Sequence, residues 1–93
     1  MRKVNDILEA EREFDMKVWY DRKQVLTEAV RSGGHTAPPR EIVKDMLLAM
    51  ADVEKKYGKE NLGPYTDFEW GMVNGKLSAL RWVLGDDWDM LDT

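Results

Sequence analysis

Acidic side chains crowd the N-terminal part of the chain at a spacing that suits a metal ion. Glu9, Glu11, Glu13 and Asp15 fall within seven residues, and Asp21 follows six residues later. Carboxylates that project from one helix face are common ligands of divalent cations. One hypothesis is therefore a metal-dependent enzyme in which Glu11, together with Asp15 or Asp21, holds a divalent cation.

The partners that such chemistry needs are missing from the sequence. Four-helix diiron proteins add Glu-x-x-His pairs to their carboxylates, and the one histidine, His35, stands between Gly34 and Thr36 in a glycine-rich stretch. The Glu-x-x-Glu and Glu-x-x-Asp pairs of all-α nucleotide pyrophosphohydrolases are also absent. Because Glu13 and Lys17 have the i, i+4 spacing of a surface ion pair, we favour a solvated helix face. We assign no catalytic residue, no metal ligand and no cofactor.

The composition argues against several classes of partner. The 93 residues carry 14 basic and 18 acidic side chains, a formal net charge of -4, and nucleic-acid binding needs a cationic surface that neutralises phosphates. There is no cysteine, and no uncharged run is long enough to span a bilayer. We expect a cytoplasmic protein without nucleic-acid or membrane partners. The acidic charge leaves one alternative open, a decoy that occupies the nucleic-acid groove of a host protein.

Glycine and proline cluster at two places, residues 32–39 and 58–64, and divide the chain into three segments. Each segment repeats apolar residues at helical spacing. We predict an all-α fold in a single domain over residues 1–93: a three-helix antiparallel bundle with a long first helix and a short C-terminal helical turn, capped by Asp86 or Asp87. The helices are expected at about residues 6–31, 39–57 and 67–84.

Local signals at the ends of the segments support these bounds. Asn5 or Asp6 is the expected N-cap of the first helix, and the Gly33-Gly34 pair supplies the left-handed conformation that ends it. Thr66 and Glu69 have the spacing of a capping box, in which each side chain accepts a backbone N–H of the other residue. The start of the third helix is therefore the best defined.

The first helix has more apolar surface than one neighbouring helix covers. A second apolar stripe, formed by Leu8, Trp19, Leu26 and Val30, lies beside the main one, and together the two span about 200° of the helix. We expect this second stripe to be the contact surface of a homodimer, because two copies can bury the same patch about a twofold axis. The alternatives are a kink in the helix, or a C-terminal tail (residues 88–93) that folds back over the stripe.

The third helix carries apolar residues on two sides, and we predict it to be the most buried of the three. One side holds Phe68, Met72, Ala79, Trp82 and Val83, and the other holds Trp70, Val73, Leu77, Leu80 and Leu84. Gly71, Gly75 and Ala79 recur at four-residue intervals. Such a small-residue row lets another helix backbone approach closely, so we predict helix packing there.

The last 25 residues or so resemble a group of known sequences. The resemblance rests on the run Leu77-Ser78-Ala79-Leu80-Arg81-Trp82-Val83-Leu84-Gly85 and the acidic, Trp88-bearing tail after it. It is similar to the C-terminus of small bacterial and phage proteins of uncharacterised function. The resemblance implies a cytoplasmic prokaryotic or phage origin and a C-terminus that belongs to the fold, and it implies no activity or cofactor.

These observations favour a small helical protein that acts through protein–protein contacts as a homodimer, without catalysis. The metal-dependent enzyme and the acidic decoy are the alternatives.

Overall fold

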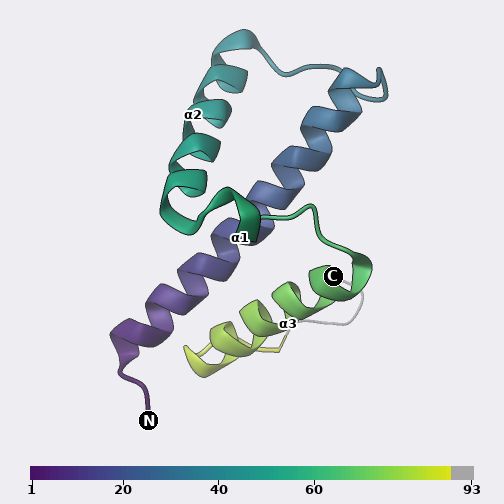
Figure 1. The fold of residues 1–93 in the computed structure, drawn as a ribbon. Helices are drawn as coiled ribbons and strands as arrows, with labels where there is room; N and C mark the ends of the chain where they lie inside the picture. Colours follow the sequence, from purple (N-terminus) through teal and green to yellow (C-terminus); the bar gives the residue numbers. More distant parts are fainter. Residues whose placement is uncertain (89–93) are drawn as a thin grey trace. The chain divides into compact units, whose positions relative to one another are not determined.

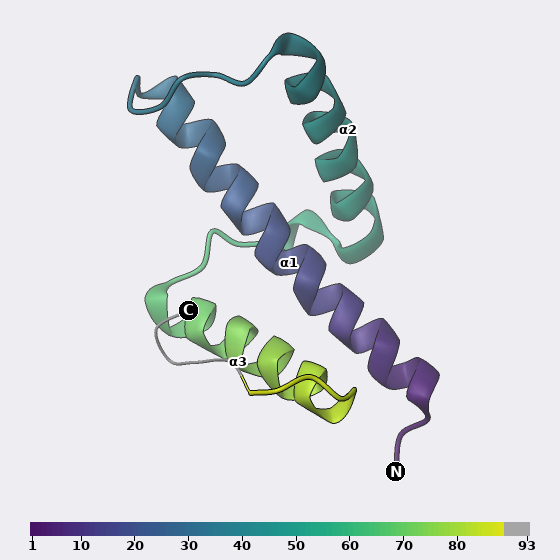
Figure 2. The same cartoon turned by 180° about the vertical axis from the view of Figure 1, so that it is seen from behind.

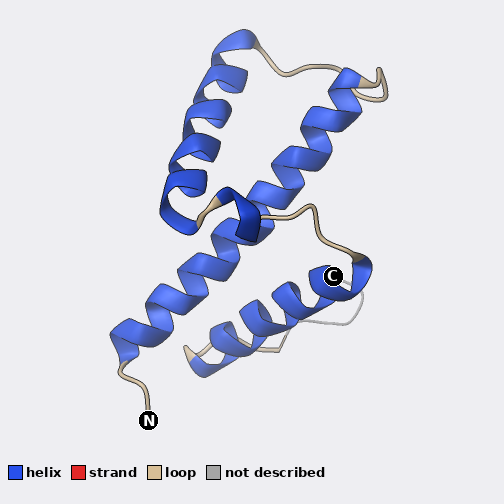
Figure 3. Ribbon diagram, viewed as in Figure 1, coloured by secondary structure: helices blue, strands red, loops and turns tan. Residues whose placement is uncertain are grey.

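A computed structural model describes residues 1–88 of the chain (Figure 1). Its helices are α1 (Val4–Arg31), α2 (Arg40–Tyr57) and α3 (Asp67–Val83), and a 3-10 turn, η1, covers Lys59–Asn61. That part of the chain contains no strand (Figure 3). The predicted all-α fold with a long first helix is confirmed, and every helix end lies within two residues of its expected place.

The chain forms two compact units, and each unit contains one part of α1. Unit 1 consists of residues 1–18 and the chain from Tyr65 onward, which includes α3. Unit 2 consists of residues 19–64, which include α2 and η1. The prediction of one domain over the whole chain stays a prediction.

Within unit 2, α2 runs antiparallel to its part of α1 (Figures 1 and 2). Leu26 lies beside Met46 near the start of α2, whereas Tyr20 contacts Glu54 near its end. Within unit 1, α3 has the same antiparallel relation to the N-terminal part of α1. Its Lys76 lies over the Phe14 ring, and its Leu80 shares a groove with residues about two turns earlier in α1.

The start of α1 differs from the prediction. The helix begins at Val4, so Asn5 and Asp6 both lie inside it and neither is the N-cap. The Asp6 carboxylate instead accepts the backbone N–H of Lys3 at 3.3 Å. An acid at the third helical position satisfies a free N–H in this way, so Asp6 stabilises a helix start two residues earlier than expected.

The other end of α1 follows the prediction. Gly33 has a φ of 81°, which only glycine adopts readily. The Gly34 N–H donates to the Ala29 carbonyl at 2.8 Å, and the Gly33 N–H donates to the Val30 carbonyl at 3.1 Å. These two bonds form the glycine-terminated end expected of this helix. Helix α1 is uninterrupted over its 28 residues, and the alternative of a kink within it stays a prediction.

The capping box of α3 is confirmed. The Thr66 N–H donates to the Glu69 carboxylate at 2.9 Å, and the Glu69 N–H donates to the Thr66 hydroxyl at 3.2 Å. The Asp86 N–H donates to the Arg81 carbonyl at 2.9 Å, across Gly85 with its φ of 113°. The helix therefore has a defined bond at each end.

The chain beyond α3 packs on that helix as far as the structure describes it. The Trp88 ring stacks on the Trp82 ring with centroids 4.9 Å apart and planes 11° apart. Residues 86–88 form no helical turn. The predicted C-terminal turn otherwise falls on residues 89–93, which also hold Met90 and Leu91 of the proposed fold-back, and these lie outside the described residues.

Few side chains are fully covered. The buried apolar residues are Val18 and Leu77 in unit 1 and Tyr20, Val53 and Leu62 in unit 2. The prediction that α3 is the most buried helix is wrong, because α1 contains two buried residues, Val18 and Tyr20, and α3 contains one, Leu77. Among the described residues of unit 1, the N-terminal part of α1 is the one helix beside α3, and one helix covers only one side of another. The side of α3 that holds Phe68, Met72, Ala79, Trp82 and Val83 is exposed.

Candidate interaction surfaces

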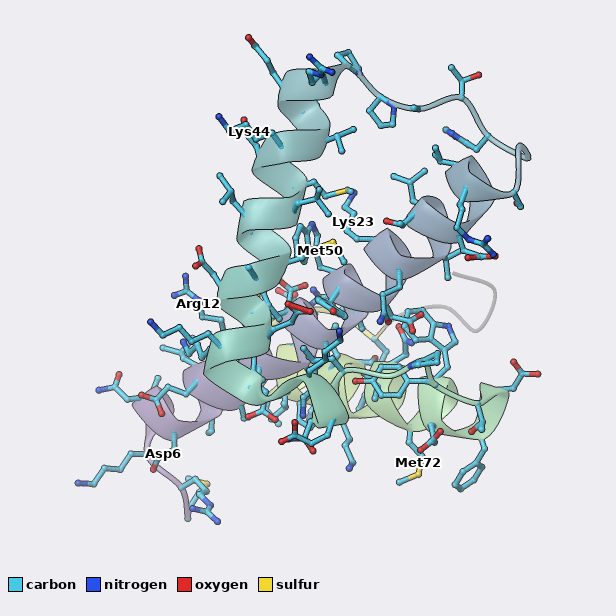
Figure 4. The ribbon with its side chains drawn as sticks, turned by 45° about the horizontal axis from the view of Figure 1, so that its top comes forward. Asp6, Arg12, Lys23, Lys44, Met50 and Met72 are labelled. Carbon is cyan, nitrogen blue, oxygen red and sulfur yellow. The ribbon has the colours of Figure 1, made fainter. Side chains whose placement is uncertain are left out.

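Three of the four residues predicted to form the dimer surface lie together in unit 2. Trp19, Leu26 and Val30 are half-buried and line hollows between α1 and α2. The larger is a groove of about 380 Å³ lined by Trp19, Lys23, Leu26, Pro38, Ile42, Asp45, Met46 and Ala49. Lys23 from α1 and Met50 from α2 both project into the space between these helices (Figure 4). Helix α2 therefore covers part of the stripe that the sequence assigned to a second copy.

Leu8, the fourth residue of that set, belongs to unit 1. Its side chain is 46% exposed, and Val4, one helical turn earlier, is 65% exposed. The two form a small apolar patch at the N-terminal end of α1. The structure thus brings Trp19, Leu26 and Val30 together and places Leu8 in the other unit.

A larger apolar surface lies on α3, and we call it the outer face of α3. It consists of Phe68, Gly71, Met72, Gly75, Ala79, Trp82 and Val83, all of them exposed. A Cβ atom placed on Gly71 or Gly75 meets no atom within 4 Å. Met72 points outward from the helix (Figure 4). The small-residue row identified in the sequence therefore lies on an open surface of this chain.

The pattern in the sequence identified every residue of the outer face of α3, but we predicted these residues to be buried and they are exposed. Hydrophobic periodicity reports which residues share a side of a helix, but it does not report which side a neighbour covers. The sequence did show that this side of α3 carries no charged residue between Asp67 and Val83. An uncharged helix side is ordinarily buried, and here it is exposed.

Two of the three carboxylates considered for a metal ion are held by an arginine, and the third, Asp21, belongs to unit 2. Arg81 of α3 lies 2.9 Å from the Asp15 carboxylate and 3.5 Å from the Glu11 carboxylate. The sequence did not indicate this bridge, because Arg81 is 66 residues from Asp15. Within residues 1–88, no group of three or more histidines and acids is placed to hold a metal ion. The predicted pair of Glu13 and Lys17 is confirmed at 2.7 Å.

Unit 2 contains a buried polar contact that the sequence did not single out. Tyr20 is only 2% exposed, and its hydroxyl donates a hydrogen bond to the Glu54 carboxylate at 2.8 Å. Burial, then the hydrogen bond and negative charge of Glu54, raise the pKa of Tyr20 to about 12. A buried phenol that stays protonated at neutral pH and donates to a carboxylate is a structural group, so this pair links α1 to α2.

Comparison with protein-family models, curated proteins and solved structures finds no match for this chain. The resemblance of its C-terminal run to bacterial and phage proteins stays a prediction. None of the described helices combines the length and the apolar character that a membrane crossing requires. The function is therefore inferred from the surfaces and side-chain chemistry of the chain itself.

Proposed function

We propose that this protein acts through protein–protein contacts, as a homodimer in the cytoplasm, and has no catalytic role. The observation that carries the proposal is the imbalance between covered and uncovered apolar side chains. Among the described residues, five apolar side chains are buried and thirteen large ones are exposed. Contiguous exposed apolar patches on a folded protein are typical of contact surfaces.

The exposed apolar residues are grouped rather than scattered. In unit 1 most of them lie on the outer face of α3 and at Val4 and Leu8 of α1, and in unit 2 they include Ile42 and Leu47 of α2. Leu8, Trp19, Leu26 and Val30 remain part of the proposed contact surface, the first as an exposed residue and the others as lining of the unit 2 grooves. Self-association covers such surfaces without a second gene product.

The absence of a catalytic role is proposed from the side chains that would do chemistry. Glu11 and Asp15 are both engaged by the Arg81 guanidinium. Tyr20 is buried and hydrogen-bonded. His35 is exposed in the loop after α1, with its ring nitrogen Nδ1 2.7 Å from the Thr36 carbonyl oxygen. Each of these groups has a structural partner, which supports an interaction protein over an enzyme.

Light scattering at several protein concentrations tests the proposal. We expect a mass of twice the 10.8 kDa of one chain at high micromolar concentration, with dissociation on dilution. A mass of one chain at every concentration overturns the homodimer.

Titration with magnesium and manganese tests the enzyme alternative. A ligand that binds only the folded state raises the melting temperature. Because we propose that the chain holds no metal ion, we expect neither a heat of binding nor a change in melting temperature. Binding heat that Glu11→Gln abolishes contradicts the proposal and supports the metal-dependent enzyme.

A further inference from the structure

The outer face of α3 is a continuous uncharged surface. Successive residues of a helix turn by about 100°, so Phe68, Gly75 and Trp82 stand almost in one line along it. The side chains of Phe68 and Trp82 are 77% and 49% exposed. Met72 and Val83 flank this line and are 45% and 56% exposed. Aromatic residues at both ends and glycine at the centre give the face a saddle shape.

This face is nearly symmetric about Gly75. Phe68 stands seven residues before Gly75, and Trp82 stands seven residues after it. Gly71 and Ala79 stand four residues before and after. In an antiparallel pair of α3 helices that cross at Gly75, each position lies opposite the position equally far on the other side. Phe68 then meets Trp82 and Gly71 meets Ala79, the self-matching pattern that an interface about a twofold axis uses.

The centre of the face is open to a second backbone. Helices pack with their axes about 8–10 Å apart, and the side chains at the crossing set the distance. At Gly71 and Gly75 an added Cβ meets nothing within 4 Å, so no part of the described chain occupies the crossing point. Two glycine-centred faces can therefore approach to the short end of that range. This approach brings Phe68 of one copy towards the Trp82 ring of the other, on which Trp88 is stacked.

The area of the face is what a small specific dimer needs. A fully covered aromatic side chain removes about 150–250 Å² from water. At the exposures of Phe68, Met72, Trp82 and Val83, the face offers about 500 Å² per copy, or about 1,000 Å² in a pair. Complete coverage of the face therefore reaches the lower limit for a specific interface.

The geometry points to a second copy of this chain as the occupant of the face: two α3 helices pack antiparallel by their outer faces and cross at Gly75. This inference rests on the proposed function and deepens it, because it names the surface through which the homodimer forms.

Gly75→Lys tests which face is used. The new side chain enters open space in the single chain and replaces a poor helix former, so α3 stays folded while the crossing point is filled. We expect this variant to have the mass of one chain at concentrations where the unaltered protein has twice that mass. Ala51→Lys is the matched control, since Ala51 is an exposed small residue within α2. It is expected to leave the dimer unchanged.

Cross-linking tests the orientation and does not depend on a disrupted variant. The chain has no cysteine, so an introduced thiol is unique. With a short thiol-reactive cross-linker, we expect a mixture of Gly71→Cys and Ala79→Cys chains to form covalent dimers, and each variant alone to form few. Efficient cross-linking of Gly71→Cys alone indicates parallel pairing and overturns the inference.

The outcomes separate this inference from the proposed function. A single-chain mass for the unaltered protein at every concentration overturns both. A dimer that survives Gly75→Lys, with no cross-linking between positions 71 and 79, overturns the α3 interface and leaves the homodimer standing on another surface. Loss of the dimer in Gly75→Lys but not in Ala51→Lys, with cross-linking only in the mixture, supports both.

Discussion

At the scale of single residues, Tyr20 is a group whose ionisation the fold opposes. A free tyrosine ionises near pH 10, whereas burial and the hydrogen bond to Glu54 raise the pKa of Tyr20 to about 12. The folded state thus keeps a proton that the unfolded chain releases between these two values. Below pH 10 the contribution of this pair to stability is complete, and it is lost as pH rises towards 12.

We expect urea unfolding of Tyr20→Phe to reveal the pH-dependent contribution of Tyr20 to stability. Near neutral pH the variant loses about 1 kcal/mol, because a hydrogen bond to a carboxylate is removed. Between pH 10 and 12 the unaltered protein loses up to about 2 kcal/mol more than the variant does. Other titrating groups are common to both proteins and cancel in the difference. Identical pH dependence in the two proteins would contradict the role given to Tyr20.

Arg81 offers a second prediction, because it lies between two carboxylates on one side of α1. Replacing it with methionine leaves Glu11 and Asp15 facing each other at the i, i+4 spacing, where like charges repel. We expect Arg81→Met to lower the free energy of unfolding by about 1 kcal/mol at low salt. The loss should shrink in 1 M NaCl, where exposed charges are screened within about 3 Å.

Arg31→Met is the control for that measurement. Arg31 pairs with Glu28 at 2.6 Å, but both side chains are exposed and the pair lies within one turn of α1. We expect no measurable change in stability. A salt-independent loss in Arg81→Met would indicate that its alkyl chain packs on α1 and that its charge contributes little.

At the scale of elements, the capping box decides where α3 begins. The Thr66 N–H and hydroxyl both contact Glu69, and these bonds, the backbone one first, hold the pKa of the Glu69 carboxyl below its usual value. Its contribution is therefore present above the unfolded pKa and lost as pH falls through the folded pKa. We expect Thr66→Ala to cost about 1 kcal/mol at neutral pH, measured by urea unfolding.

Thr36→Ala is the matched control, since Thr36 is an exposed loop residue that caps no helix. In Glu69→Gln we expect the acid-dependent part of the loss to disappear while Thr66 still caps. Equal stability of Thr66→Ala and Thr36→Ala would show that packing of α3, and not its cap, sets the start of the helix.

The elements also show how far sequence reasoning reaches. Thr66, Glu69 and the Gly33-Gly34 pair act on backbone groups within a few residues, so their roles follow from spacing alone. The role of Asp6 was predicted wrongly, because an aspartate can cap a helix either as its N-cap residue or from the third helical position. The bridge from Arg81 to Asp15 and the contact between Tyr20 and Glu54 join distant parts of the chain, and nothing local marks them. Exposure of the outer face of α3 likewise depends on which side a neighbour covers.

At the scale of the whole molecule, the small number of buried side chains ties folding to association. Five buried apolar residues among those described are few for a chain of 93 residues. A partner that binds only the folded state stabilises it by mass action, so covering the outer face of α3 adds to the stability of each copy. For a homodimer the size of this effect depends on the concentration of the protein itself.

We therefore expect the melting temperature of the unaltered protein to rise with its own concentration. Over a hundredfold range, calorimetry should show an increase of several degrees, because 1 kcal/mol shifts the melting temperature of a domain this size by about 4–8 °C. In Gly75→Lys the melting temperature should be the same at every concentration, since chains that do not associate gain no stability when their concentration rises. Light scattering could show a dimer whose melting temperature does not depend on concentration. Each chain would then complete its fold alone, and the outer face of α3 would contribute to recognition but not to stability.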